Sequence, residues 1–550
     1  MIATPAAFAQ RVAAPPAELI VTNARVYTAD DARPLAEAFA VRDGRVVFVG
    51  SKQEADALKG PNTRVLDVGG KTVIPGMVDA HAHFGGLAQT LRSVDLTGTR
   101  SYDEVIARVV ERAKTTPKGK WIEGRGWDQN AWGDTRFPTH EKLSAAVPDH
   151  PVILTRVDGH AALVNSLAMR EAALTAATKD PSGGQIIRDS KSAPTGVLID
   201  RAQGIVSTKV PDPTTPEVRA ALKEAISVMH RWGLTGMHDA GASKSSIDLF
   251  EEMAKSNELN LRLYVMIGDD PAALQHYMSI GPRSALYNSQ LWVRSIKLYA
   301  DGAMGSRGAA LLEPYSDDPN NTGLLLSPRE HIRDVAERAL KAGFQVNSHA
   351  IGDRGNRVVL DAYEQAFKTV PTADHRFRVE HAQILNYDDI PRFAQLGVIP
   401  SMQASHQTSD MYWIGKRLGP TRVLGAYAWR SLLNSGVVIP NGSDFPVEQV
   451  NPLISFHASI ARQDANDWPA GGWFPEQRMS REEALRSMTL WPAYSAFQEK
   501  EMGSLTPGKL ADFVVLDQDI MRVPAELVLK TNVLATYLGG KAVYEKKQTP

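Results

Sequence analysis

The sequence predicts an α/β protein built on a (β/α)8 barrel, together with a β-sandwich to which both termini contribute. Short apolar segments alternate with helical segments through the middle of the chain, as in a parallel sheet whose strands are joined by crossover helices. The helical segments end in glycine, which commonly terminates a helix. Both ends of the chain are instead rich in β-branched residues and tight turns.

The two ends are predicted to form one composite β-sandwich domain, residues 19–72 plus 500–550. It begins with a single strand over residues 19–28, which are rich in β-branched side chains. Residues 38–50 are predicted to form two strands joined at Asp43-Gly44, because Asp-Gly favours the type I′ turn of a hairpin. Further strands are expected in residues 63–74, 509–517 and 533–545, the last with a turn at Gly539-Gly540.

The barrel is predicted to occupy residues 73–499. The helical runs PEVRAALKEAISVMHRWG and EHIRDVAERALKAG lie between its strands. About 150 residues separate the first strand from the second, several times the length of an ordinary crossover. Residues 85–215 are therefore predicted to be an insertion over the barrel mouth. The expected strands are residues 76–84, 234–241, 261–268, 293–302, 344–352, 377–385, 397–403 and 436–445.

Composition and charge exclude several classes of protein. The chain has 550 residues and no cysteine, which rules out disulfide scaffolds, thiolate metal sites and cysteine nucleophiles. Lys plus Arg number 61 and Asp plus Glu number 62, so no basic surface for nucleic acid or an anionic membrane is expected. No apolar run is long enough to predict a transmembrane helix. The expected partner is a small-molecule substrate, and the sequence leaves a homo-oligomer open.

Residues 1–18 are predicted to be either a disordered tail or the remnant of a secretory signal peptide. The segment is rich in Ala and Pro, and Ala7-Phe8-Ala9 fits the A-x-A pattern at which such signals are cleaved. A basic start and an apolar stretch, the other parts of a signal, are missing. The signal alternative implies a periplasmic or secreted protein, and the tail alternative implies a cytoplasmic one.

Histidine and aspartate close several of the predicted barrel strands, where barrel enzymes build their active sites. His81 and His83 end the first strand. Alternate residues of a strand share a face about 6–7 Å apart, so both imidazoles can reach one metal ion. His349, His381 and Asp444 end three other strands, where each alone is more often a core residue or a helix cap. Imidazole and carboxylate together suit Zn, Mn, Co or Fe, so the combination indicates a metal site.

Lys297 lies inside the predicted strand SIKLYADG, between the apolar Ile296 and Leu298. It shares a strand face with Tyr299 and Asp301. A lysine inside a barrel needs an anionic partner or a changed charge state. The alternative interpretation is an outward lysine on the strand flank or an ion pair within the barrel.

Five segments together resemble the amidohydrolase superfamily, and specifically its amidohydrolase-family-3 branch, which includes N-substituted formamide deformylases. They are VIPGMVDAHAHF, IKLYADGAMGSRGAAL, NSHAIGD, VEHAQ and NGSDFPVE, and the similarity runs over residues 19–545. The resemblance implies a (β/α)8 barrel with a composite β-sandwich. It also implies a binuclear centre of two divalent ions, with zinc as the expected metal.

The resemblance further implies a role for each candidate ligand. Lys297, carbamylated by carbon dioxide, would bridge the two metals, which would turn a buried cation into an anion. Asp444 would contact the buried metal and the attacking water, and would act as general base and then general acid. The other implied ligands are His81 and His83 for the buried metal, and His349 and His381 for the second metal.

The predicted function is hydrolysis of a non-peptide C–N bond, a linear amide, by a metal-activated hydroxide. One alternative is a mononuclear deaminase, or a hydrolase of ring C–N bonds, on the same scaffold. Relatives of that kind lack the bridging lysine. Another alternative is a binding scaffold that has lost catalysis, which a missing ligand would support.

Five further residues are candidates for substrate binding, each with a structural alternative. Trp127, Asp158 and His160 are expected to line the pocket from the insertion, or else to pack inside it. His238 ends the second barrel strand and could bond substrate or a ligand, or be structural. Arg307, in the loop after the fourth strand, could bind a polar group of the substrate or stabilise the loop.

Overall fold

The computed structural model describes residues 15–547, apart from 130, 131, 133–135, 157, 158, 160, 182, 183 and 306. The tail expected over residues 1–18 therefore lies almost wholly outside the described residues. The described chain divides into two compact units. One unit comprises the residues up to His83 together with those from Ile226 onward, and the other is Phe84–Ala225.

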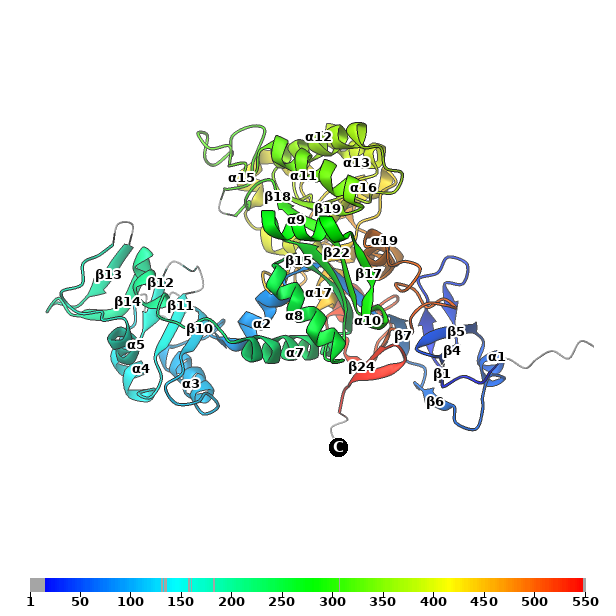
Figure 1. The fold of residues 1–550 in the computed structure, drawn as a ribbon, viewed down its shortest axis with the longest axis horizontal. Coiled ribbons are helices and arrows are strands. Elements are labelled where there is room, and N and C mark those ends of the chain that lie inside the picture. Colours follow the sequence, from blue (N-terminus) through cyan, green and yellow to red (C-terminus); the bar gives the residue numbers. More distant parts are fainter. Residues whose placement is uncertain are drawn as a thin grey trace, which may run out of the picture. The chain divides into compact units, whose positions relative to one another are not determined.

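The first unit contains a β-sandwich built from both ends of the chain. One sheet has the strand order β5-β4-β1-β6, and the other has the order β25-β24-β23-β7-β2-β3. The C-terminal strands, red in Figure 1, therefore continue a sheet begun by the blue N-terminal strands. The strands are β1 (Leu19–Thr22), β2 (Arg25–Tyr27), β3 (Leu35–Ala36), β4 (Ala38–Arg42), β5 (Arg45–Gly50), β6 (Arg64–Asp67), β7 (Thr72–Pro75), β23 (Phe513–Leu516), β24 (Val533–Leu538) and β25 (Lys541–Glu545).

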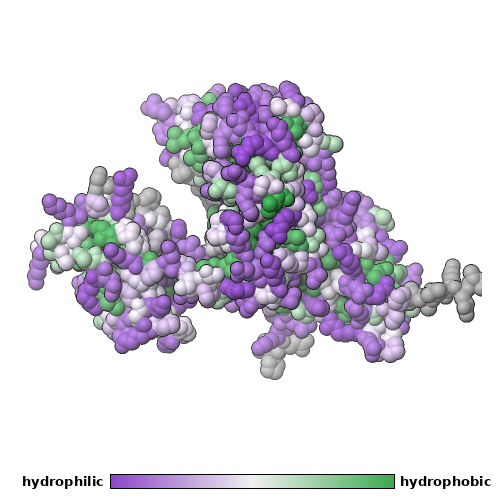
Figure 2. Space-filling model, viewed as in Figure 1, coloured by the Kyte–Doolittle hydropathy of each residue, from purple (hydrophilic) through white to green (hydrophobic). Residues whose placement is uncertain are grey.

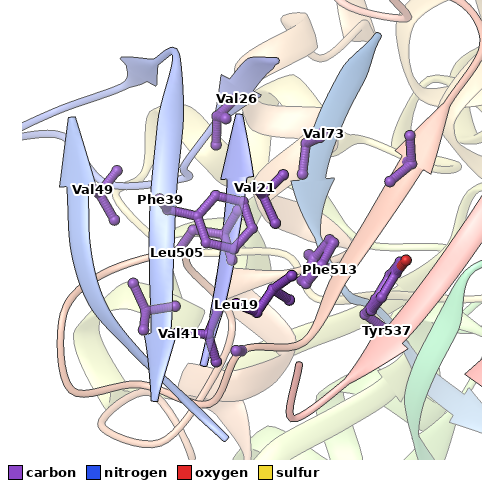
Figure 3. Close-up of a cluster of buried hydrophobic side chains, with 13 residues drawn as sticks. Leu19, Val21, Val26, Phe39, Val41, Val49, Val73, Leu505, Phe513 and Tyr537 are labelled. Atoms are coloured by element: carbon purple, nitrogen blue, oxygen red, sulfur yellow. The ribbon is translucent and has the colours of Figure 1, made fainter. Parts of the chain in front are cut away.

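Aromatic and branched side chains from the two sheets form the sandwich core (Figure 3). Phe39 and Phe513 meet edge to face with ring centroids 5.0 Å apart, and Phe513 stacks on Tyr537 at 4.3 Å. Burying a side chain of this size stabilises a fold by about 1.5–3 kcal/mol. The core therefore joins the first and last parts of the sequence.

The turns of the sandwich show where the sequence analysis succeeded and where it failed. The predicted hairpin between β4 and β5 is confirmed, with φ of 51° at Asp43 and 71° at Gly44. Residues 19–28, predicted as one strand, instead form β1 and β2 in different sheets. The chain turns at Asn23, whose φ of 51° is left-handed and whose side-chain amide donates to Asp67 Oδ1 at 2.8 Å.

The barrel of the first unit is the (β/α)8 fold that the sequence predicts. Its parallel strands run in the order β8-β15-β16-β18-β19-β20-β21-β22. Asp444 N donates to His81 O at 2.7 Å and His83 N donates to Phe445 O at 2.9 Å, which brings the first and last strands together. The strands, each overlapping its predicted segment, are β8 (Met77–Ala82), β15 (Leu234–Ala242), β16 (Arg262–Ile267), β18 (Leu291–Tyr299), β19 (Gln345–Ala350), β20 (Arg378–His381), β21 (Ile399–Gln403) and β22 (Asn441–Gly442).

Helices follow the barrel strands (Figure 1). α11 (Arg329–Ala342) stops at Gly343 with φ of 79°, and α7 (Thr215–Arg231) stops just before Gly233 with φ of 81°, as predicted for glycine at helix ends. The remaining elements of this unit include α1 (Lys52–Asp56), α8 (Lys244–Lys255), α9 (Pro271–Ile280), β17 (Arg283–Ala285), α10 (Leu286–Ser289), α11 (Arg329–Ala342), α12 (Asp353–Thr369), α13 (Ile390–Leu396), α14 (Ala404–Asp410), α15 (Ile414–Arg422), α16 (Trp429–Asn434), α17 (Pro452–Ala461), α18 (Arg481–Ser487), α19 (Leu490–Ser495) and α20 (Ala525–Val528).

A buried ion pair joins the barrel to the sandwich. Arg262, the first residue of β16, donates from Nε and Nη2 to the two carboxylate oxygens of Asp512, each at 2.9 Å. Both side chains are almost fully buried. Gly76 N, just before β8, donates to Asp512 O at 2.8 Å. Because removing one partner of a buried pair costs about 3–5 kcal/mol, these contacts fix the sandwich against the base of the barrel.

The second unit, Phe84–Ala225, has a sheet and apolar cores of its own. Its strands run in the order β13-β14-β12-β11-β10-β9, with parallel and antiparallel neighbours. One core surrounds Leu143 and Leu163 and another surrounds Met169 and Leu198. The elements are α2 (Phe84–Arg92), β9 (Val94–Asp95), α3 (Tyr102–Ala113), β10 (Ile122–Trp127), α4 (His140–Ala146), β11 (Val152–Arg156), β12 (Ala161–Val164), α5 (Ser166–Glu171), β13 (Gly184–Arg188), β14 (Pro194–Asp200), α6 (Gly204–Ser207) and most of α7 (Thr215–Arg231).

Hydrophilic residues cover most of the surface seen in Figure 2, with hydrophobic residues in small scattered groups. Scattered apolar residues of this kind are normal on protein surfaces. Among the residues that the structure describes, no helix combines the length and the apolar character that crossing a bilayer requires.

Candidate metal centre

The C-terminal end of β8 brings two histidines to the mouth of the barrel. His81 is fully buried, whereas His83, one residue past the strand, keeps 34% of its side-chain surface exposed. Nε2 of His83 lies 3.0 Å from Asp444 Oδ1, and Nε2 of His81 lies 3.6 Å from the same oxygen. The three side chains converge closely enough for one metal ion to be held between them.

Asp444, two residues past β22, and His381, the last residue of β20, have a left-handed backbone conformation. φ is 60° at Asp444 and 75° at His381. This region costs a residue other than glycine about 1–3 kcal/mol, and such strain is concentrated at functional sites. Neighbouring hydrogen bonds hold the strained turn beside β22, since Ser443 Oγ donates to Asp79 Oδ2 at 2.6 Å. The backbone is therefore fixed where the two side chains meet the other candidate ligands.

His349 and His381 supply the other two imidazoles of the cluster. Their ring centroids are 4.5 Å apart, and the His381 ring lies 4.8 Å from that of His81. His381 Nδ1 lies 2.7 Å from Gln403 Oε1, which leaves its Nε2 for another ligand. His349 Nε2 is buried without a hydrogen-bond partner among the described residues, although Asp301 Oδ1 lies 3.6 Å away.

Lys297 points into the barrel rather than outward. Its side chain is buried, and Nζ lies 3.4 Å from His81 Nε2 and 4.6 Å from the centre of the Tyr299 ring. Burial lowers the pKa of Lys297, against the opposing effect of Glu380 and Asp444. A lowered pKa increases the fraction of neutral amine, the form that reacts with carbon dioxide.

Glu380 is a residue of this cluster that the sequence analysis missed. It stands next to His381 in β20, and its Oε2 lies 2.5 Å from His81 Nδ1. Arg378 Nε lies 2.7 Å from the other carboxylate oxygen. Burial would raise the pKa of Glu380, but Arg378 and His81 lower it to about 2, so the carboxylate stays charged. A charged acceptor at Nδ1 turns Nε2 of His81 toward the cluster, the arrangement typical of metal-bound histidine.

His406 is the second residue that was missed. It lies in α14, just after β21, with Nε2 3.3 Å from Asp444 Oδ2 and Nδ1 3.3 Å from Glu448 Oε1. Burial would lower the pKa of His406, but Asp444 and Glu448 raise it to about 10. The only signal in the sequence was a histidine three residues beyond a predicted barrel strand.

The chemistry of these side chains fits a divalent metal. Burial, with Lys297 adding to the effect, lowers the pKa of His81 to about 4 and that of His349 to about 3, so both imidazoles are neutral at pH 7. Burial alone would raise the pKa of Asp444, but His406 and His83 hold it well below its usual range. Neutral imidazole and charged carboxylate are the forms that bind Zn and similar ions. The orphaned Nε2 of His349 also fits a missing partner.

The structure thus brings together all the sequence-predicted metal-ligand candidates, and two of the substrate candidates contact other protein side chains. His238 is fully buried in β15, with Nδ1 2.9 Å from Arg378 Nη1, and its contact with substrate or a ligand stays a prediction. Arg307 pairs with Asp317 in the loop after β18, at 2.9 Å, which fits the loop-stabilising alternative. The residues brought together are His81, His83, Lys297, His349, His381 and Asp444.

The insertion candidates do not form a described pocket. Trp127 is completely buried in the core of the second unit, and its indole nitrogen donates to Leu154 O at 2.7 Å. The expected substrate contact of Trp127 is therefore corrected to core packing, because its ring and its N–H are both already satisfied. Asp158 and His160 lie outside the described residues.

Comparisons with known proteins agree with this architecture. The sequence model of the amidohydrolase family matches residues 64–544. Protein LONG AFTER FAR-RED 3 of Arabidopsis thaliana is 35% identical to this chain over 543 residues, which cover 96% of the chain and 92% of that protein. N-substituted formamide deformylase of Arthrobacter pascens is 29% identical over 552 residues, covering 96% and 98% of the two chains.

Solved structures agree as well. The crystal structure of an uncharacterized metal-dependent hydrolase from Pyrococcus furiosus superimposes with a TM-score of 0.76 and 28% identity, covering 92% of this chain and 100% of that one. The family match extends over most of the chain and includes every residue of the histidine, lysine and aspartate cluster. The chain belongs to the amidohydrolase family.

Proposed function

We propose that the chain is a metal-dependent hydrolase that cleaves a linear, non-peptide amide. The observation that carries the proposal is Lys297, buried among the histidines with Nζ 3.4 Å from His81 Nε2. A buried ammonium beside candidate metal ligands would oppose metal binding, whereas a carbamate made from the same side chain would support it. The similarity to N-substituted formamide deformylase supports an amide as the substrate.

Two divalent ions, with zinc the expected metal, would be held by this cluster. His81 and His83 would take one ion, His349 and His381 the other, and carbamylated Lys297 would bridge them. Bound ions of this kind lower the pKa of water and polarise a carbonyl group. Glu380 at His81 Nδ1 and Gln403 at His381 Nδ1 would keep the ligand nitrogens in place.

Asp444 would move the proton. In the overall reaction an amide R–CO–NH–R′ and water give R–COOH and R′–NH2. Asp444 accepts a proton from the attacking water as the new C–O bond forms, and then donates that proton to nitrogen as the C–N bond breaks. Its pKa, held low by His406 and His83 against the effect of burial, keeps it in the acceptor form before the first step.

The test is turnover of a panel of substrates by zinc-loaded and chelated protein. N-alkyl and N-aryl formamides, N-acyl amino acids and carbamates are assayed beside aminated and chlorinated ring compounds. The proposal expects hydrolysis of at least one linear amide, abolished by chelation and restored by zinc. Turnover of ring compounds alone would favour the deaminase alternative, and metal-loaded protein inactive on every substrate would favour the scaffold alternative.

A further inference from the structure

Through the oxygen that His81 and His83 do not face, Asp444 also contacts a polar chain that the proposed ligand set does not use. It consists of His406 from the first turn of α14 and Glu448 from the loop after β22. His406 is 12% exposed at its side chain and Glu448 is 20% exposed. Both are therefore shielded enough for their hydrogen bonds to be stronger than contacts at an open surface.

The His406 ring is held at both of its nitrogens. Nδ1 lies 3.3 Å from Glu448 Oε1, and Nε2 lies 3.3 Å from Asp444 Oδ2. Ser409 Oγ, one turn further along α14, donates to Glu448 Oε1 at 2.6 Å and so holds the far end of the chain. With carboxylate oxygens on opposite sides, the imidazole cannot rotate without losing both contacts.

The two oxygens of Asp444 consequently have different partners. Oδ1 faces His81 and His83, the candidate metal ligands, whereas Oδ2 faces His406. Oδ2 is the oxygen with a hydrogen-bond partner, so the contact with His406 limits rotation of the Asp444 carboxylate. That matters for a group that must receive a proton from water and deliver it to a nitrogen, because proton transfer requires hydrogen-bond distance to both atoms in turn.

We propose that His406, anchored by Glu448, is a positioning residue that fixes the Asp444 carboxylate for proton delivery to the leaving nitrogen. The inference rests on the proposed amide hydrolysis. Amide nitrogen departs as an amine only after it receives a proton, whereas a phenoxide leaves an ester without one. Loss of the anchor should therefore slow amides much more than aryl esters.

The experiment compares His406→Gln, Glu448→Gln and the double variant with a matched control, His331→Gln. His331 also pairs with a carboxylate, Asp269 at 2.8 Å, but it lies on the outer helix α11. Each variant is assayed for zinc per chain and for kcat and KM on the N-alkyl formamide best used by the wild type and on phenyl formate.

We expect His406→Gln to keep wild-type zinc and KM while its kcat on the formamide falls about 10²-fold, in the range of general acid–base effects. The loss on phenyl formate should be less than about a tenth of that. Glu448→Gln should show a smaller loss of the same kind, and the double variant should be no worse than His406→Gln, because the two residues act as one chain. His331→Gln should behave as wild type.

Three results would overturn the inference. Loss of zinc from His406→Gln would make His406 a metal ligand, equal losses on amide and ester would make it merely structural, and an unchanged kcat would give it no role. Failure of the wild type on every amide would instead refute the proposed function. In that case a crystal structure of zinc-loaded His406→Gln still tests the role of His406. If the Asp444 carboxylate keeps its wild-type orientation in that structure, His406 does not position it.

Discussion

At the scale of single residues, burial sets the charge of the candidate site. Burial lowers the pKa of the fully buried His81 to about 4 and that of the mostly buried His349 to about 3. Glu380 is as deeply buried, yet Arg378 keeps its pKa at about 2. The imidazoles are therefore neutral, and the charged carboxylate of Glu380 orients the ring of His81. Neutral, oriented imidazoles are the form in which histidine binds a metal cation.

The low pKa of His81 gives a pH prediction for the metal-free protein. The folded state protonates His81 at about pH 4, whereas an unfolded imidazole does so at about 6.5. As pH falls from 6.5 to 4, the unfolded state gains a proton that the folded state refuses, so the free energy of unfolding decreases. Urea unfolding of the chelated protein measures this effect. Between pH 6.5 and pH 4 the free energy of unfolding should fall by about 3 kcal/mol more in wild type than in His81→Asn.

The surface histidine His331 provides the control for that measurement. Its side chain is 41% exposed, so His331→Asn makes the same chemical change outside the buried cluster. Equal slopes for wild type and His81→Asn between pH 6.5 and 4 would contradict the assignment of a depressed pKa to His81.

Asp444 gives the second prediction at this scale. Asp444→Asn removes the acceptor of the water proton while keeping a polar side chain of the same size. We expect metal content to stay near that of wild type and kcat on an amide to fall about 10²–10⁴-fold. Elemental analysis and initial rates on the same preparation check this. A metal-replete Asp444→Asn variant with wild-type kcat would show that another group moves the proton.

Some site residues could be predicted from the sequence because they sit where a strand ends. His81, His83 and Asp444 follow apolar runs, and that position alone places them at the barrel mouth. Glu380 could not be placed in the same way. Strict alternation along β20 would put Glu380 and His381 on opposite faces, but a left-handed φ of 75° at His381 breaks the alternation.

His406 was missed for a different reason. Its position depends on the direction in which α14 leaves β21, and on a loop 42 residues further along the chain that carries Glu448. No local pattern encodes that meeting. Contacts between the starts of helices and the loops of other strands are set by tertiary packing, so a single sequence gives no signal for them.

At the scale of elements, short breaks decide which sheet a strand joins. The β-branched residues of the segment 19–28 predict one continuous strand. The left-handed backbone at Asn23 instead divides the segment into two strands that join different sheets. Likewise β6 pairs with β1 while β7 pairs with β2 and β23. The hydrophobic pattern of the sequence predicts where the strands lie. The backbone conformation at the turn between two strands decides which sheet each of them joins.

Asn23 therefore gives a stability prediction. Asn23→Val places a β-branched residue at φ of 51° and also removes the hydrogen bond to Asp67. The left-handed conformation costs such residues about 1–2 kcal/mol, so we expect the free energy of unfolding to fall by at least that amount. Asn23→Gly, which tolerates the same φ, should lose less. Denaturant unfolding in which valine and glycine are equally tolerated would contradict this account.

At the scale of the whole molecule, the insertion Phe84–Ala225 is a compact unit with its own sheet and cores. Domains with separate cores unfold as separate cooperative units more often than not. The catalytic proposal rests on the other unit alone, because every candidate metal ligand lies in a barrel strand or just after one. Stability of the insertion and metal binding should therefore respond to different substitutions.

Trp127 tests that separation. Trp127→Ala removes a fully buried ring and should destabilise the insertion by about 3–5 kcal/mol while leaving metal content unchanged. Hydrogen exchange should show the loss of protection confined to Phe84–Ala225. The control Trp232→Ala alters a ring that is 38% exposed and should have little effect. Loss of protection that spreads evenly to the barrel strands would show that the two units unfold together.

The most direct test of the central claim, a binuclear centre bridged by modified Lys297, is the number of metal ions per chain. Elemental analysis of protein loaded with zinc in the presence of bicarbonate should give close to two ions for wild type. Lys297→Ala should lose metal, and short carboxylic acids that fill the place of the carbamate should restore part of the turnover. One ion per chain in the wild type, or two ions retained by Lys297→Ala, would contradict the account.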